Sequence, residues 1–354
     1  MIKYLRKDLW DLKPYDANQQ RCKYKLDANE SPWDLPEKIK MELSQEIMNG
    51  LNANRYPDSD ATDLRKAIAQ YCDVEPENIL VSSGSDELIH ILTNAFVEKG
   101  DAVLCPTPSF GMYKIFTKIS GGVPVEVPLD GNYNYQIDVF LEAIKRHNPK
   151  MIFLCTPNNP TGNDMPTSDI MKILDSFSGI VVIDEAYIEF GNESMTKKIL
   201  DYPNGIVLRT FSKAIGLAGL RIGYSICNKE LAFQLYKVKP PYNVNTFSQK
   251  AAYICLKNIE IIRRRILYIK EQRENLIALL NQIDGVHTYP TKSNFILIQV
   301  PDGNRVYNAL LSQGILVRNF SDHPMLKNCL RITVGDEEAN NALYKALKEV
   351  VSLI

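Results

Sequence analysis

The chain has 354 residues, of which 45% are hydrophobic and 23% are charged, a composition typical of globular proteins rather than of disordered or fibrous ones. Lys and Arg number 41 against 42 Asp and Glu, so the charge indicates no broad basic surface and no nucleic-acid partner is expected. The length allows two domains.

The start of the chain and its cysteines favour a cytoplasmic protein. Residues 1–16, MIKYLRKDLWDLKPYD, carry charges every few positions and lack the apolar core of a signal peptide. No run approaches the ~20 apolar residues of a membrane span. The seven cysteines are scattered and form no CxxC pair, which favours reduced thiols over disulfides or a zinc site. The four histidines show no metal-ligand spacing, so no metal is expected.

The first predicted elements in chain order are an arm, a helix and a series of strands. Residues 1–28 have no strong period and are expected to pack on another part of the protein. A helix is predicted over 86–100, with Gly100 as its stop. Short apolar runs bounded by turn residues indicate buried strands at 102–106, 151–155, 180–184, 206–211 and 221–226. Alternating strands and helices predict an α/β fold with a mostly parallel sheet.

The pattern changes near residue 250. A long, charged, amphipathic helix is predicted over 256–283, and a final helix over 337–354. Between them, short apolar runs predict strands at 294–300, 314–318 and 330–334. The predicted organisation is therefore an arm (1–28), a large domain (29–250) and a smaller α+β domain (251–354) that packs with the arm.

Two turn motifs follow predicted strands, at the sheet edge where open α/β folds bind ligands. VSSGSDELI at 81–89 leads small residues directly into a helix, which suits a bound phosphate or a simple N-cap. CTPNNPTGN at 155–163 contains two prolines and a glycine, and these fix a rigid turn that presents Asn158 and Asn159. Such a turn can serve a site or be purely structural.

Two further motifs carry charged side chains in apolar surroundings. In VVIDEAYIEF (181–190), Asp184 follows an apolar strand, where an ionised carboxylate needs a partner such as a protonated ring nitrogen, unless it caps a helix. In TFSKAIGLAGLRIGY (210–224), Lys213 lies among small and apolar residues, with Arg221 eight positions on. An amine in such a pocket has a depressed pKa and suits Schiff-base chemistry, while Arg221 offers a bidentate fork for phosphate.

Together these motifs resemble a known family. Asn-Pro-Thr-Gly, then Asp-x-x-Tyr, then Ser-Lys with an arginine eight residues later resembles the fold type I pyridoxal-phosphate aminotransferases, over nearly the whole chain. KLDANESPWDLP, NRYPD, PTPSFGMYK and LRITVG are similar to stretches of the histidinol-phosphate aminotransferases. The resemblance implies a large domain with a mostly parallel seven-stranded sheet flanked by helices, a smaller α+β domain, and a homodimer.

The resemblance also implies roles at the cofactor, pyridoxal 5'-phosphate. Lys213 would bind it covalently and then move the proton. Asp184 would pair with the ring nitrogen, Asn159 and Tyr187 would hydrogen-bond the phenolic oxygen, and Phe110 would stack on the ring. The phosphate would be held by Ser85, Asp86, Thr210, Ser212 and Arg221, together with the partner subunit's Tyr56.

For the substrate, the resemblance implies a second set of residues. Arg331 in LRITVG resembles the arginine that takes the carboxylate of glutamate, and Arg318 on the preceding strand would join it, unless Arg318 is a surface residue. Asn29 would lie near the substrate, and the partner subunit's Tyr15 would complete the pocket. The implied reaction is reversible transfer of an amino group between L-histidinol phosphate and 2-oxoglutarate, in histidine biosynthesis.

Three alternatives stay open. A threonine-phosphate decarboxylase of the same lineage also binds a small phosphorylated amino compound, although that branch carries a His-Gly-Gly-Asn-like stretch where this chain has LDANES. An aromatic amino-acid aminotransferase is a second alternative, because a pocket for imidazole can accept a phenyl ring. A non-catalytic ligand sensor would need a DNA-binding module, and the ~25 residues before LDANE are too few for an independently stable one.

Overall fold

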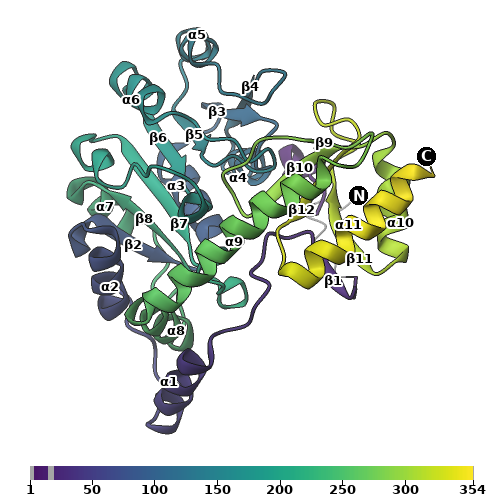
Figure 1. Ribbon diagram of the computed structural model, residues 1–354. Coiled ribbons are helices and arrows are strands. Elements are labelled where there is room, and N and C mark those ends of the chain that lie inside the picture. The colour runs from purple at the N-terminus through teal and green to yellow at the C-terminus, as the bar shows by residue number, and fades with distance from the viewer. Residues whose placement is uncertain (1–3, 15–19, 354) are drawn as a thin grey trace.

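The computed structural model describes residues 4–14 and 20–353, and its larger sheet has seven strands (Figure 1). The strand order is β2-β8-β7-β6-β5-β3-β4, and only β8 runs antiparallel to its neighbours. The predicted mostly parallel, seven-stranded sheet is thus confirmed. The strands are β2 (Ile79–Ser82), β3 (Ala102–Thr107), β4 (Val123–Pro128), β5 (Met151–Cys155), β6 (Ile180–Asp184), β7 (Gly205–Thr210) and β8 (Gly223–Cys227).

Helices cover both faces of this sheet, which explains its continuous apolar strands. One face, with Phe153, Val182 and Leu208, packs under α3, α4 and α7. The other, with Ile152 and Val207, packs under α2, α5 and α6. The helices are α1 (Glu37–Met48), α2 (Thr62–Cys72), α3 (Ser85–Phe96), α4 (Met112–Ile119), α5 (Ile137–His147), α6 (Thr167–Ser176), α7 (Lys229–Tyr236) and α8 (Thr246–Lys257).

A second, five-stranded sheet has the order β1-β11-β12-β10-β9. Its edge strand β1 comes from the beginning of the chain and pairs in parallel with β11, whereas the other pairs are antiparallel. The strands are β1 (Tyr24–Leu26), β9 (His287–Thr288), β10 (Phe295–Gln299), β11 (Ile315–Asn319) and β12 (Cys329–Thr333). The helices beside it are α9 (Ile259–Leu280), α10 (Gly303–Ser312) and α11 (Glu337–Ser352).

The two sheets are linked by α9, which runs from beside α8 to the small sheet (Figure 1). One buried apolar cluster extends from Leu26 to Val351 across both parts. The domain boundaries at residues 28 and 250 stay a prediction. None of the helices in the described part of the chain is long and apolar enough to cross a membrane.

Some predicted bounds were wrong. The long helix predicted over 256–283 is α9 alone, because Asn258 separates it from α8 and bonds back to Ile254 O at 3.0 Å. Strand β8 begins at Gly223 and not at residue 221, because Arg221 has a φ of +50° and turns the chain there. The helix predicted to reach Gly100 ends at Phe96, since Val97 is already extended.

Candidate active site

The carboxyl ends of neighbouring strands bring most of the predicted site residues to one region. In the register of the large sheet, Asp184 lies opposite Cys155 on one side and Leu208 on the other. Thr210 ends β7 opposite Gly223, the first residue of β8. Asp184 and Thr210 face the side of the sheet covered by α3 and α4, because they alternate with residues that face the other side.

Lys213 lies in the loop after β7 and is partly buried. Its Nζ donates a hydrogen bond to Ala28 O at 2.8 Å and lies 5.9 Å from the centre of the Tyr187 ring. Burial, with the positive charges of Arg331 and Arg221, lowers the pKa of Lys213 from 10.5 to about 8. The amine is therefore deprotonated far more readily than a surface lysine.

Asp184 is a buried carboxylate with only neutral donors around it. Its Oδ2 accepts a hydrogen bond from the Tyr113 hydroxyl at 2.6 Å, and its Oδ1 accepts one from the Ala186 amide at 3.1 Å. Burial raises the pKa of Asp184 to about 6. In residues 4–14 and 20–353, no basic side chain forms an ion pair with it. The Asp184 carboxylate can therefore pair with a cationic group of a ligand.

The start of α3 and the loop around Arg221 form an anion-binding cradle. Gly84, with a φ of +83°, precedes Ser85 at the N-terminus of the helix, where free amides and the helix dipole attract a phosphate. Arg221 Nη1 donates to Ser212 Oγ at 3.3 Å, and its Nη2 lies 3.2 Å from Asp86 Oδ2. The Thr210 and Ser212 hydroxyls are 3.0 Å apart. The structure thus brings together the five phosphate-binding residues predicted from the same subunit.

Two glycines make this cradle possible. A Cβ atom on Gly84 would lie 2.6 Å from Arg221 Nη2. A Cβ on Gly223 would lie 2.5 Å from both Gly84 C and Ser85 N. A side chain on Gly84 would displace the Arg221 guanidinium, and one on Gly223 would push the helix start away from β8.

A polar network connects the two sheets beside Lys213. Arg331 in β12 donates to Asn159 Oδ1 and, at 2.6 Å, to Asp27 O. The side-chain Nδ2 of Asn29 donates to the Tyr187 hydroxyl at 3.0 Å, and Thr333 Oγ1 donates to Asn29 Oδ1. Residues predicted for the cofactor and for the substrate are therefore in direct contact.

The two arginines predicted to bind substrate lie opposite each other on neighbouring strands of the small sheet. Arg318 in β11 pairs in register with Arg331 in β12. Guanidinium groups on neighbouring strands suit a ligand that carries a carboxylate or a phosphate.

Of the remaining predicted residues, Phe110 lies beside the Asp184 site and Tyr56 lies on the surface. Phe110 precedes α4 and packs edge-on against Tyr113, with ring centres 5.5 Å apart. Tyr56 is 82% exposed and stacks on Tyr242 at 4.6 Å. Within residues 4–14 and 20–353, Tyr56 stacks on Tyr242 and forms no hydrogen bond or ion pair with the Lys213 site of its own chain. Tyr15 lies outside the described residues.

Sequence reasoning missed two features of the site. One is Tyr113. The only sign of it in the sequence is that it follows Phe110 by three residues, a spacing that puts both side chains on the same side of a helical turn. The other is a buried ion pair between Arg209 and Glu185, with Nη2 and Oε2 2.9 Å apart. These residues directly adjoin Thr210 and Asp184 in sequence, so the ion pair joins the ends of β6 and β7.

The described residues fit pyridoxal phosphate. The cradle around Arg221 suits the phosphate, the buried carboxylate of Asp184 suits a protonated ring nitrogen, and the amine of Lys213 suits an aldehyde. Among the residues that the structure describes, no group of three or more His, Cys, Asp or Glu side chains could hold a metal ion.

Comparison with known proteins agrees with this site. Residues 22–347 match the family "Aminotransferase class I and II". A histidinol-phosphate aminotransferase of Caldanaerobacter subterraneus subsp. tengcongensis is 45% identical over 98% of this chain and 99% of its own length. One of Pyrococcus furiosus is 39% identical over 97% of this chain and 96% of its own length. The crystal structure of the Sinorhizobium meliloti histidinol-phosphate aminotransferase with pyridoxal-5'-phosphate covers 100% of this chain and 99% of its own, with a TM-score of 0.92 and 25% identity.

Proposed function

This chain belongs to the class I and II aminotransferases, and within them to the histidinol-phosphate aminotransferases, and on that premise we propose its reaction. It transfers an amino group reversibly between L-histidinol phosphate and 2-oxoglutarate, giving imidazole-acetol phosphate and L-glutamate. The observation that carries the substrate assignment is the pairing of Arg318 with Arg331, which suits substrates that bear a carboxylate or a phosphate.

Pyridoxal phosphate, when bound, supplies an aldehyde that exchanges amino groups and a ring that accepts electron density. Asp184 would hold the proton on the ring nitrogen, because a buried carboxylate stabilises a cation beside it. The cradle of Ser85, Asp86, Thr210, Ser212 and Arg221 would hold the phosphate. Phe110 would pack on the ring.

Lys213 would accept a proton from the reacting carbon of the substrate and return it. A pKa of about 8 suits both roles near neutral pH, since neither form of the amine is rare. Asn159 and Tyr187 would hydrogen-bond the phenolic oxygen of the cofactor. Because Asn159 also accepts from Arg331, substrate binding at Arg331 and cofactor binding at Asn159 would affect each other.

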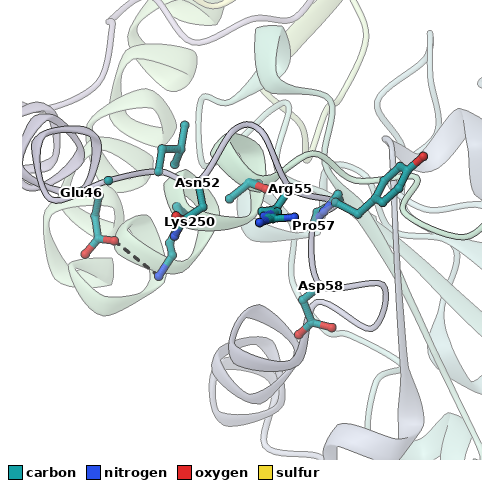
Figure 2. Close-up of a pocket in the computed structure, with 10 residues that line it drawn as sticks. Glu46, Asn52, Arg55, Pro57, Asp58 and Lys250 are labelled. Atoms are coloured by element: carbon teal, nitrogen blue, oxygen red, sulfur yellow. Dashed lines mark ion pairs between the residues drawn. The ribbon is translucent and has the colours of Figure 1, made fainter.

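The proposal includes a homodimer in which Tyr56 and Tyr15 act on the partner's site. Its support is the exposed ring of Tyr56 beside a hollow of about 210 Å³. Figure 2 shows the Glu46–Lys250 ion pair at one side of this hollow and Asp58 at the other, with Arg55 between them. An exposed aromatic ring and an arginine at one surface suit contact with a second copy of the chain.

A role in histidine biosynthesis and a cytoplasmic location complete the proposal. All seven cysteines are free thiols. Thiols in this number persist where the compartment is reducing.

A half-reaction tests the substrate. The purified enzyme, loaded with cofactor, is mixed with L-histidinol phosphate in the absence of a keto acid, and its visible absorbance is followed. We expect the absorbance band to disappear and 2-oxoglutarate to restore it, while a Lys213→Ala variant shows neither change. A band that persists with histidinol phosphate but disappears with phenylalanine or tyrosine would favour the aromatic aminotransferase. Carbon dioxide released from threonine phosphate would favour the decarboxylase.

A further inference from the structure

Tyr113 is a buried tyrosine to which the proposed mechanism gives no role. It lies in the first turn of α4 and is 1% exposed. Its ring stacks on Phe153, with centres 4.7 Å apart and planes 9° apart, and Phe110 packs edge-on against it. These contacts fix the direction of its hydroxyl, which donates to Asp184 Oδ2 at 2.6 Å.

Few groups around Asp184 favour its ionised form, and the Tyr113 hydroxyl is one of them. Asp86 and Glu185 are negatively charged and oppose ionisation of Asp184, and Cys155 lies beside it on β5. The Ala186 amide supplies a hydrogen bond to Oδ1. Among the described residues, Tyr113 is the one side chain that donates a hydrogen bond to this carboxylate.

We propose that Tyr113 is a positioning residue that keeps the Asp184 carboxylate ionised and turned toward the cofactor's ring nitrogen. The inference rests on the proposed function, because it takes pyridoxal phosphate as the cofactor. Each carboxylate oxygen accepts two hydrogen bonds, and the protein supplies one to each oxygen of Asp184. Both oxygens therefore keep the capacity to accept one from a ring N–H.

Removing the hydroxyl would favour the protonated form of Asp184. A hydrogen bond to the charged form of an acid lowers its pKa, so its loss in Tyr113→Phe would raise the pKa of Asp184 above the value of about 6. A rise of about one unit would make a tenfold difference in the ratio of protonated to ionised carboxyl. A protonated carboxyl cannot form an ion pair with the ring.

The test measures binding of pyridoxine 5'-phosphate, which has no aldehyde, to the cofactor-free full-length chain from pH 5.5 to 8.5. For Tyr113→Phe we expect a Kd about fivefold higher than wild type near pH 6, and wild-type affinity near pH 8.5. The probe ionises in the same way with every variant, so its own ionisation cancels when the Kd of a variant is divided by the Kd of wild type at the same pH. Tyr135→Phe is the matched control, because it removes a hydroxyl that bonds only to the backbone of Cys155, at 2.7 and 3.1 Å.

Infrared spectra give a second readout that does not need the probe. Between pH 6 and 7, cofactor-free Tyr113→Phe should show a carboxylic-acid band that is weaker in wild type and absent from Asp184→Asn. If Tyr113→Phe does not fold, 3-fluorotyrosine at position 113 provides the test instead. Its hydroxyl is a stronger hydrogen-bond donor, so the loss of probe binding on the acid side of the pH profile (the acid limb) should occur at lower pH than in wild type.

Equal weakening at every pH, or equal behaviour of Tyr113→Phe and Tyr135→Phe, would overturn the inference. So would an unchanged acid limb with 3-fluorotyrosine. If wild type fails to bind the probe at all, the cofactor assignment fails instead.

Discussion

Burial and two neighbouring arginines together lower the pKa of the Lys213 amine. The positive charges of Arg331 and Arg221 oppose its protonation, whereas Glu30 and Asp86 favour it. Burial dominates, and the pKa falls to about 8. The reactivity therefore comes from the fold around the lysine.

This predicts how fast Lys213 reacts with an aldehyde as the pH changes. Only the unprotonated amine is a nucleophile, so the rate at which the cofactor-free protein reacts with pyridoxal phosphate should rise with pH around a midpoint near 8. Stopped-flow absorbance measures this rate. In Arg331→Gln, with one positive charge fewer, the midpoint should move upward. A wild-type midpoint near 10.5 would contradict the prediction.

Asp184 should lower the stability of the cofactor-free protein. Its native pKa, about 6, lies above the ordinary value of 3.8, so the native state binds the proton more tightly than the unfolded state does. The penalty is fully present above pH 6 and disappears as the pH falls from 6 toward 3.8, and it amounts to about 3 kcal/mol at most.

We therefore expect cofactor-free Asp184→Asn to be more stable than wild type at pH 8, by about 1–3 kcal/mol, and equally stable near pH 4. Urea unfolding at the two pH values measures the difference. The same variant should bind the cofactor more weakly. A variant that is less stable than wild type at pH 8 would show that the carboxylate stabilises the native state.

At the scale of elements, the start of α3 rests on the start of β8. Gly223 has no room for a Cβ because Gly84 C and Ser85 N are too close. Gly223→Ala should displace the helix start and weaken pyridoxal phosphate binding about tenfold or more, since phosphate-binding amides act only in the correct position. Gly219→Ala is the control, because nothing lies within 4 Å of its added Cβ. Titration of the cofactor-free proteins compares them, and equal affinities would refute the argument.

The ends of β6 and β7 are joined by a buried charge cluster. Arg209 is paired with Glu185 at 2.9 Å and with Glu189 at 3.6 Å, and all three side chains are buried. Arg209→Met would leave two carboxylates unpaired and should lower the free energy of unfolding by about 3–5 kcal/mol. Lys197→Met, which removes the exposed ion pair with Asp73, should leave the urea midpoint almost unchanged. Equal effects of the two variants would contradict this.

At the scale of the whole molecule, the proposed dimer shares its sites between subunits. A mixed dimer of Tyr56→Phe and Lys213→Ala subunits should recover one complete site, and hence about half of the wild-type activity, if Tyr56 acts on the partner. Each variant alone, at the same total concentration, is the control. Activity that stays at the level of the separate variants would refute the shared site.

Local patterns in the sequence predicted much of the fold. Residues 151–155 and 180–184 are strands with the predicted bounds, because a continuous apolar run between turn residues suits a doubly covered strand. Helix ends were less well predicted. Asn258 interrupts the long helix through a bond to Ile254 O and one to Glu42 in α1, and the second depends on tertiary packing.

The sequence by itself determined that these strands exist and which motifs follow them, and with them Lys213, Asp184, Asn159 and Arg221 as site candidates. Only the tertiary structure decided which side chains meet. Tyr113 reaches Asp184 across 71 positions of sequence, and Arg331 reaches Asn159 across 172. The register that sets Arg318 opposite Arg331 belongs to the pairing of two strands. The physical reason is that patterns along the chain report local conformation and burial, whereas contacts between distant residues follow from how the elements pack.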